Sequence, residues 1–187
     1  MEHSVAYLVF DGDQCLVSGL LPEVLTALKT RFNEGSAGAL LVFDAETGKQ
    51  RDFDLAGSLD DVLARVEPAP LPKPGPGRPK LGVVAREISL LPRHWEWLEG
   101  QPSGASAAIR RLVDEARNRD PQKEQARIAR EATGRFLTAV AGNRAGFEEA
   151  LRALYAGNCE GFEARIADWP PDIGEHARRM AEPAWLR

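Results

Sequence analysis

The chain has only two cysteines, Cys15 and Cys159, and their separation suits neither a disulfide framework nor a zinc cluster. Aromatic residues make up 7% of its 187 residues. No apolar run approaches the roughly 18 residues that a membrane helix needs, so we expect no membrane span. Residues 1–4 have neither a basic stretch nor a long apolar one, so we expect no export signal and a cytoplasmic location.

The familiar catalytic motifs are also absent. There is no Gly-x-Gly-x-x-Gly, no phosphate-binding Walker loop, no Gly-x-Ser-x-Gly and no His-Glu-x-x-His. A nucleophilic Cys–His pair would need a cysteine beside one of the three histidines, and nothing in the sequence places them together. Cys159, Asp172, Glu175 and His176 follow no standard metal-ligand spacing. We therefore predict that the protein is not an enzyme and uses neither a cofactor nor a metal.

Charge is distributed unevenly along the chain. Residues 1–70 hold 5 basic and 12 acidic residues, residues 71–119 hold 9 and 5, and residues 120–187 hold 10 and 11. The pI near 5.5 of the whole chain argues against a nucleic-acid partner. The basic excess is nevertheless gathered in the middle third, where a polyanion can bind. A solvated surface with a small basic excess is the alternative interpretation.

The acidic region 1–67 has the pattern of a small α/β domain of order ββαββα. Short runs of strand-forming residues alternate with helical spacing. The expected strands are residues 5–10, 15–17, 39–43 and 51–55, and the expected helices are residues 21–32 and a segment capped by Ser58. The aspartates of this region fall in turns or on the polar side of the last strand. We interpret them as turn formers and solvent-facing residues, not as a metal site.

A proline-rich linker over residues 68–81 follows. Six of the chain's 13 prolines lie in residues 68–80, and such a segment forms neither a helix nor a central strand. Its end, Pro76-Gly-Arg-Pro-Lys80, resembles the Gly-Arg-Pro core of an AT-hook. That resemblance implies that Arg78 enters the minor groove of A·T-rich DNA and that Lys80 meets phosphate. A plain linker is the alternative.

The basic segment 82–119 carries the main functional hypothesis. Residues 83–91 have strand composition, Pro92 opens a short helix, and a second helix begins near Ser106 with apolar residues at helical spacing. We expect Trp95 to lie in the core, and Trp97 to pack on another domain.

This order of elements resembles the ribbon-helix-helix fold of bacterial repressors and antitoxins, with Ser106-Ala-Ala-Ile-Arg-Arg-Leu-Val-Asp-Glu-Ala116 as the closest piece. The resemblance implies that two chains pair their strands and place the ribbon in the DNA major groove. It implies that the second helix points backbone N–H groups at a phosphate. The DNA-contacting residues would be Arg86, Ser89, Arg93, Gly104, Ser106, Arg110 and Arg111, together with Arg78 and Lys80.

The C-terminal region 120–187 has the pattern of a small helical bundle. Helical spacing of apolar residues is found over residues 122–140, 147–155, 162–169 and 172–180, with glycine or proline at the breaks.

The whole chain resembles an uncharacterised bacterial family of the domain-of-unknown-function class. The resemblance is carried by residues 41–48, 77–87, 94–98 and 104–106, and it implies no particular activity. We predict an α+β protein with three parts that binds double-stranded DNA as a homodimer and regulates transcription. The alternative is a protein–protein interaction scaffold whose middle segment only dimerises.

Overall fold

The computed structural model describes residues 6–35, 40–66 and 84–186. Within them the chain forms two compact units. Unit 1 combines the described residues up to 66 with those from 122 onward, and unit 2 comprises residues 84–121. The predicted α+β class is confirmed, and the regions expected to form the N-terminal and C-terminal domains pack together as one body.

Three antiparallel strands form the sheet of unit 1. They are β1 (Ala6–Asp11), β2 (Gln14–Leu20) and β3 (Leu40–Asp44), in the order β2-β1-β3. The β1–β2 hairpin turns through Gly12, whose φ of +57° suits a residue without a side chain. Because β1 is central, its side chains are buried on both faces of the sheet.

The predicted fourth strand over residues 51–55 is wrong. Beyond β3 the ladder continues only as an isolated bridge between Phe43 and Gln50. The alternation that suggested a strand reflects the partial burial of Phe53 and Leu55, which pack beside α1 without a strand partner. A side chain supplies a hydrogen bond to the backbone of this segment instead, since Lys29 Nζ donates to the Leu55 carbonyl at 2.9 Å.

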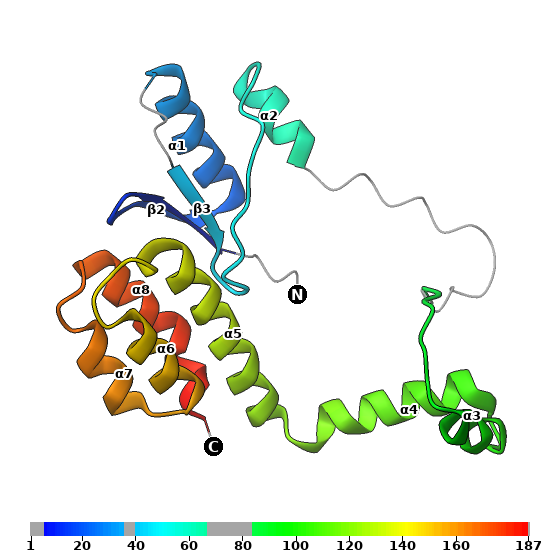
Figure 1. The fold of residues 1–187 in the computed structure, drawn as a ribbon. Coiled ribbons are helices and arrows are strands. Elements are labelled where there is room, and N and C mark those ends of the chain that lie inside the picture. The colour runs from blue at the N-terminus through cyan, green and yellow to red at the C-terminus, as the bar shows by residue number, and fades with distance from the viewer. Residues whose placement is uncertain (1–5, 36–39, 67–83, 187) are drawn as a thin grey trace. The chain divides into compact units, whose positions relative to one another are not determined.

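Unit 1 has three layers (Figure 1). Helices α1 (Leu21–Asn33) and α2 (Leu59–Val66) cover one face of the sheet, where Tyr7 and Val9 point into their core. The opposite face, with Leu8 and Phe10, packs against the C-terminal helices. These helices are α5 (Pro121–Ala141), α6 (Phe147–Tyr155), α7 (Cys159–Ile166) and α8 (Pro171–Ala181), followed by the 3₁₀ turn η1 (Glu182–Trp185). The four predicted C-terminal helices are therefore present.

An aromatic cluster joins the sheet to α5. The ring of Phe136 lies 5.4 Å from that of Phe10 and 5.2 Å from that of Phe43, and all three side chains are fully buried. Rings at these separations add to the free energy gained by burying their area. The N-terminal sheet and the C-terminal helices thus share one hydrophobic core.

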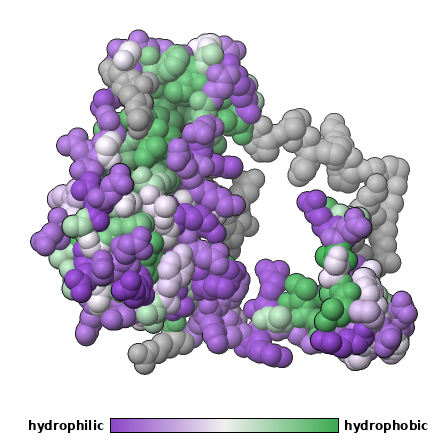
Figure 2. Space-filling view, viewed as in Figure 1, coloured by the Kyte–Doolittle hydropathy of each residue, from purple (hydrophilic) through white to green (hydrophobic). Residues whose placement is uncertain are grey.

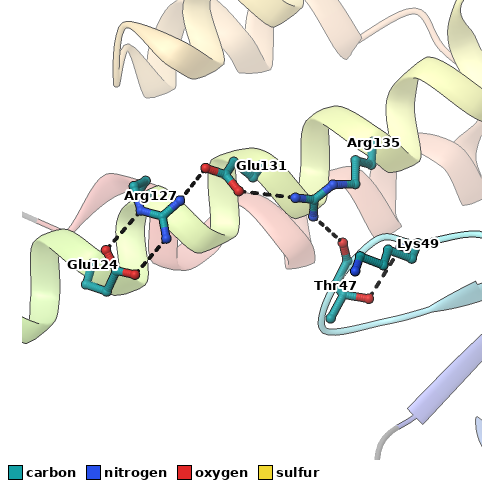
Figure 3. Close-up of polar contacts among 6 residues, drawn as sticks. All are labelled: Thr47, Lys49, Glu124, Arg127, Glu131 and Arg135. Carbon is teal, nitrogen blue, oxygen red and sulfur yellow. Dashed lines mark hydrogen bonds and ion pairs between the residues drawn. The ribbon is translucent and has the colours of Figure 1, made fainter. Parts of the chain in front are cut away.

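The loop after β3 is fixed to α5 by polar contacts as well (Figure 3). Arg135 donates to the Thr47 carbonyl at 2.8 Å and pairs with Glu131 at 3.1 Å. Arg127 bridges Glu131 and Glu124 on the same helix face. The chain of alternating charges holds Arg135 in position to reach the loop.

Unit 2 consists of an extended segment and two helices, α3 (Pro92–Glu99) and α4 (Gly104–Arg119). Residues 84–91 form no strand with any described residue, contrary to the strand composition of this segment. Among the described helices, none is long and apolar enough to cross a membrane.

Candidate nucleic-acid interface

The extended segment 84–91 has an unpaired backbone. The side chains of residues 84–89 are exposed, and the N–H groups of residues 84–91 find no acceptor among the described residues. The Leu91 carbonyl accepts from the N–H groups of His94 and Trp95 at the start of α3. An extended segment with free N–H and C=O groups can pair with another strand. The two-stranded ribbon of the ribbon-helix-helix resemblance requires the same segment of a second chain, so it stays a prediction.

Helix α3 begins at Pro92, which suits the first helical position because it lacks an N–H group. Leu98 is the one residue of this helix that is buried. The expectation that Trp95 lies in the core is wrong, since 36% of its surface is exposed, and Trp97 is 51% exposed. A helix of eight residues with one neighbouring helix has too little surface to bury both indole rings.

Helix α4 begins at Gly104, and the backbone N–H groups of its first residues differ in their hydrogen bonding. Gly104 has a φ of +75°, and its N–H donates to the Gln101 carbonyl at 3.0 Å. That N–H is therefore occupied. The N–H groups of Ala105 and Ser106 have no acceptor among the described residues, and these two are the groups that can meet an anion.

The predicted arginines of unit 2 are all exposed. Arg86, Arg93 and Arg110 make no ion pair with a described residue, whereas Arg111 lies 3.6 Å from Glu115 one turn further along α4. Ser89 and Ser106 are exposed too. Arg78 and Lys80 lie outside the described residues.

The charge of the described part of unit 2 is nearly balanced. Residues 84–119 hold six arginines and five acidic residues, so most of the basic excess of residues 71–119 comes from Lys73, Arg78 and Lys80. Any attraction of α3 and α4 to phosphate therefore depends on where individual arginines lie, not on net charge.

An apolar groove of about 400 Å³ runs along unit 2. Its lining combines the end of the extended segment with one face of each helix: Leu90, His94, Trp97, Leu98, Ile109, Leu112, Val113 and Ala116. Figure 2 shows hydrophobic side chains gathered over α4. The apolar positions that the sequence placed on one side of α4 thus meet α3 only in part and remain open to solvent.

Unit 1 contains a polar cluster that sequence reasoning missed. Cys15 on β2 and His176 on α8 are 161 residues apart, yet Sγ lies 3.7 Å from Nε2. His176 Nδ1 lies 2.8 Å from the Asp172 carbonyl, and the Asp172 carboxylate accepts from the Cys15 N–H at 2.7 Å. No spacing signal could have found this pair, because it exists only once the sheet packs on α8.

This Cys–His pair has the geometry but not the electrostatics of a nucleophile. Burial, followed by the Asp172 carboxylate, raises the pKa of the Cys15 thiol above its ordinary value. A raised pKa keeps the sulfur as a weakly nucleophilic thiol at neutral pH. Among the described residues, no three His, Cys, Asp or Glu side chains are grouped to hold a metal ion.

Fold and site together define an α+β protein in which a small helical unit interrupts a three-layer unit in the sequence. The chain belongs to the family described as "Uncharacterized protein conserved in bacteria (DUF2239)", which it matches over residues 6–181. The resemblance of the whole chain to an uncharacterised bacterial family is thereby confirmed. No curated protein matches the chain, and no solved structure does.

Proposed function

We propose that this protein binds double-stranded DNA as a homodimer through unit 2, and that it regulates transcription in the cytoplasm in this way, without enzymatic activity. The observation that carries the proposal is the extended segment 84–91 directly before α3 and α4, whose side chains are exposed over residues 84–89 and which pairs with no strand among the described residues. Two such segments can pair antiparallel across a two-fold axis. The resulting two-stranded ribbon has the width that the major groove admits.

The structure supports one assignment of the two faces of this ribbon. Leu90 lines the apolar groove with the helices, so its neighbour Ser89 points the other way in an extended chain. By the same alternation Glu87 lies on the side of Ser89. Ser89 can hydrogen-bond a base edge, and Glu87 can accept from the amino group of cytosine.

Phosphate contacts would come from the start of α4 and the arginines beside it. The N–H groups of Ala105 and Ser106 have no acceptor among the residues that the structure describes, and Arg110 and Arg111 lie one turn further along the helix. Arg86 and Arg93 are exposed in the segment and at the start of α3. Each phosphate neutralised releases counterions, which makes the affinity depend on salt.

The test measures binding of the full chain to a random-sequence duplex over a series of salt concentrations. Arg110→Ala/Arg111→Ala removes two phosphate contacts from each protomer, so the slope of log affinity against log salt should fall by roughly 3–4 per dimer. Arg117→Ala/Arg119→Ala is the matched control, because it removes the same charge from the far end of α4. Equal effects of the two variants, or no binding at low salt, would refute the proposal.

A scaffold that only dimerises is the second candidate. The near balance of charge over residues 84–119 and the place of Glu87 on the outward face favour it. It predicts a dimer that binds no duplex at any salt concentration. The Arg78→Ala/Lys80→Ala variant distinguishes an AT-hook from a plain linker. A loss of binding to A·T-rich duplex in this variant supports the AT-hook resemblance.

A further inference from the structure

Unit 1 has a hollow of about 640 Å³ between the loop after β3, the start of α5, the end of α8 and η1. Its apolar lining consists of Ala45, Ile128, Ala129, Met180, Pro183 and Leu186. Ala45, Ala129 and Met180 pack on the main hydrophobic core, whereas Ile128 and Leu186 are 46% and 44% exposed. Two large apolar side chains beside one concavity lose contact with water when a ligand covers them, and this favours binding.

The walls of the hollow are held in place by hydrogen bonds. Asp44 Oδ1 accepts from the N–H groups of Glu46 and Thr47 at 3.1 and 2.9 Å, which fixes the loop after β3. Arg130 Nη2 donates to the Ala184 carbonyl at 2.7 Å, which joins η1 to α5. Because the walls are already fixed, a ligand that binds here orders little of the protein.

The charged side chains of the hollow favour a cation. Glu46 and Glu182 line it, are exposed, and form no ion pair with a described residue. Among the described residues that line the hollow, Arg179 is the only basic one, and it already pairs with Glu175 at 2.7 Å. Two unpaired carboxylates beside a neutralised guanidinium attract a positive group and repel a negative one.

The size of the hollow suits a small molecule and not a protein surface. Clefts that bind small molecules have volumes of about 300–1,000 Å³. A stable protein interface covers roughly 800 Å² on each partner, which requires a broader contact surface. The other exposed large hydrophobic side chains of unit 1, Leu20, Phe32 and Tyr155, lie on β2, α1 and α6 and do not line the hollow.

We propose that the hollow of unit 1 binds a small molecule that joins an apolar body to an ammonium group. The apolar body covers Ile128 and Leu186, and the ammonium group pairs with Glu46 and Glu182. The site goes beyond the proposed function, since it lies within unit 1 and depends on neither DNA nor a second chain.

Three probes with one apolar body test the chemical class of the ligand. Phenylpropylamine, phenylpropanol and phenylpropionate carry a positive charge, no charge and a negative charge at neutral pH. Each is titrated into the full chain, and the methyl resonances of Ile128, Met180 and Leu186 report binding. Because exposed ion pairs are weak, the amine should bind roughly 3–10-fold more tightly than the alcohol, and the carboxylate more weakly than both. Equal affinities of amine and alcohol, a carboxylate that binds most tightly, or no methyl shift up to the solubility limit of the amine overturns the proposal.

A charge variant tests the two carboxylates while it preserves their shape. Glu46→Gln/Glu182→Gln should lower the affinity for phenylpropylamine to that for phenylpropanol and leave the affinity for phenylpropanol unchanged. Glu148→Gln/Glu149→Gln is the matched control, because it removes the same charge from exposed positions of α6 that do not line the hollow. The control variant should keep the preference for the amine. Equal losses of preference in both variants would mean that net charge sets the preference, and this overturns the site.

An apolar variant tests the surface that the ligand body covers. Ile128→Ser should weaken the binding of amine and alcohol alike, by roughly 3–10-fold, because it removes about half of a buried aliphatic side chain's transfer free energy. Phe32→Ser is the matched control, since Phe32 is also 46% exposed but lies on α1. Far-UV circular dichroism checks that both variants are folded. An Ile128→Ser variant that binds phenylpropylamine as tightly as the unchanged protein overturns the proposal.

Discussion

The close approach of Gly48 to α5 gives the sharpest test of how the two halves of unit 1 are joined. Gly48 is buried with a φ of +64°, and a Cβ built there would lie 2.0 Å from the Ala132 carbonyl oxygen. That oxygen belongs to the backbone of the longest helix and cannot move aside. Gly48→Ala therefore combines a left-handed backbone penalty of about 1–2 kcal/mol with an overpacking penalty of about 1–3 kcal/mol.

The expected loss of unfolding free energy is thus about 2–5 kcal/mol, or roughly 5–15 °C in the melting temperature of a unit of this size. Thermal unfolding followed by far-UV circular dichroism measures it. Gly12→Ala is the matched control, because Gly12 has a φ of +57° and a Cβ there would meet nothing within 4 Å. The Gly12→Ala variant should lose only the unfolding free energy that the left-handed backbone costs, about 1–2 kcal/mol. Equal losses in the two variants would show that the loop does not pack on α5 as described.

Three further outcomes are expected. Phe10→Ala should cost about 3–5 kcal/mol of unfolding free energy, because it empties the centre of the aromatic cluster. Phe32→Ala, at a ring 46% exposed, should cost far less, and similar costs in denaturant unfolding would contradict the shared core. Thr133 is fully buried and its hydroxyl has no partner among the described residues, so Thr133→Val should raise stability by about 1 kcal/mol. If the Thr133→Val variant instead unfolds at a lower denaturant concentration than the unchanged protein, the Thr133 hydroxyl has a hydrogen-bond partner. Cys15 is partly buried with a raised pKa, so its thiolate forms at higher pH than in a free thiol, and iodoacetamide at pH 7 should label the exposed Cys159 first. Peptide mass analysis over a pH series checks this, and faster labelling of Cys15 would mean that His176 activates it.

Local patterns were sufficient to place most helices. Val24, Leu25 and Leu28 show helical spacing, and they are the buried apolar residues that pack α1 on the sheet. The Ser58 hydroxyl accepts from the Asp61 N–H at 3.2 Å, as expected of a helix cap. Such signals depend on residues three or four positions apart, which is why one sequence reveals them.

The alternation of apolar and polar residues gave a wrong prediction where it was interpreted as pairing between strands. Phe53 and Leu55 alternate with polar residues as in a strand, yet their burial is achieved without one. The same limit applies to Trp95, which was expected in the core and is 36% exposed. Spacing tells which side chains share a face, but not whether a second surface covers that face.

The amino-acid sequence by itself determined the α+β class, the helices and the separation of a basic middle segment from an acidic N-terminal region, because these follow from composition and short-range periodicity. Only the tertiary structure decided that the first and last parts form one core, that Cys15 lies beside His176, and that the apolar side of α4 stays open. These features depend on contacts between residues more than a hundred positions apart, or on the absence of a covering surface, and neither leaves a periodic trace in the sequence.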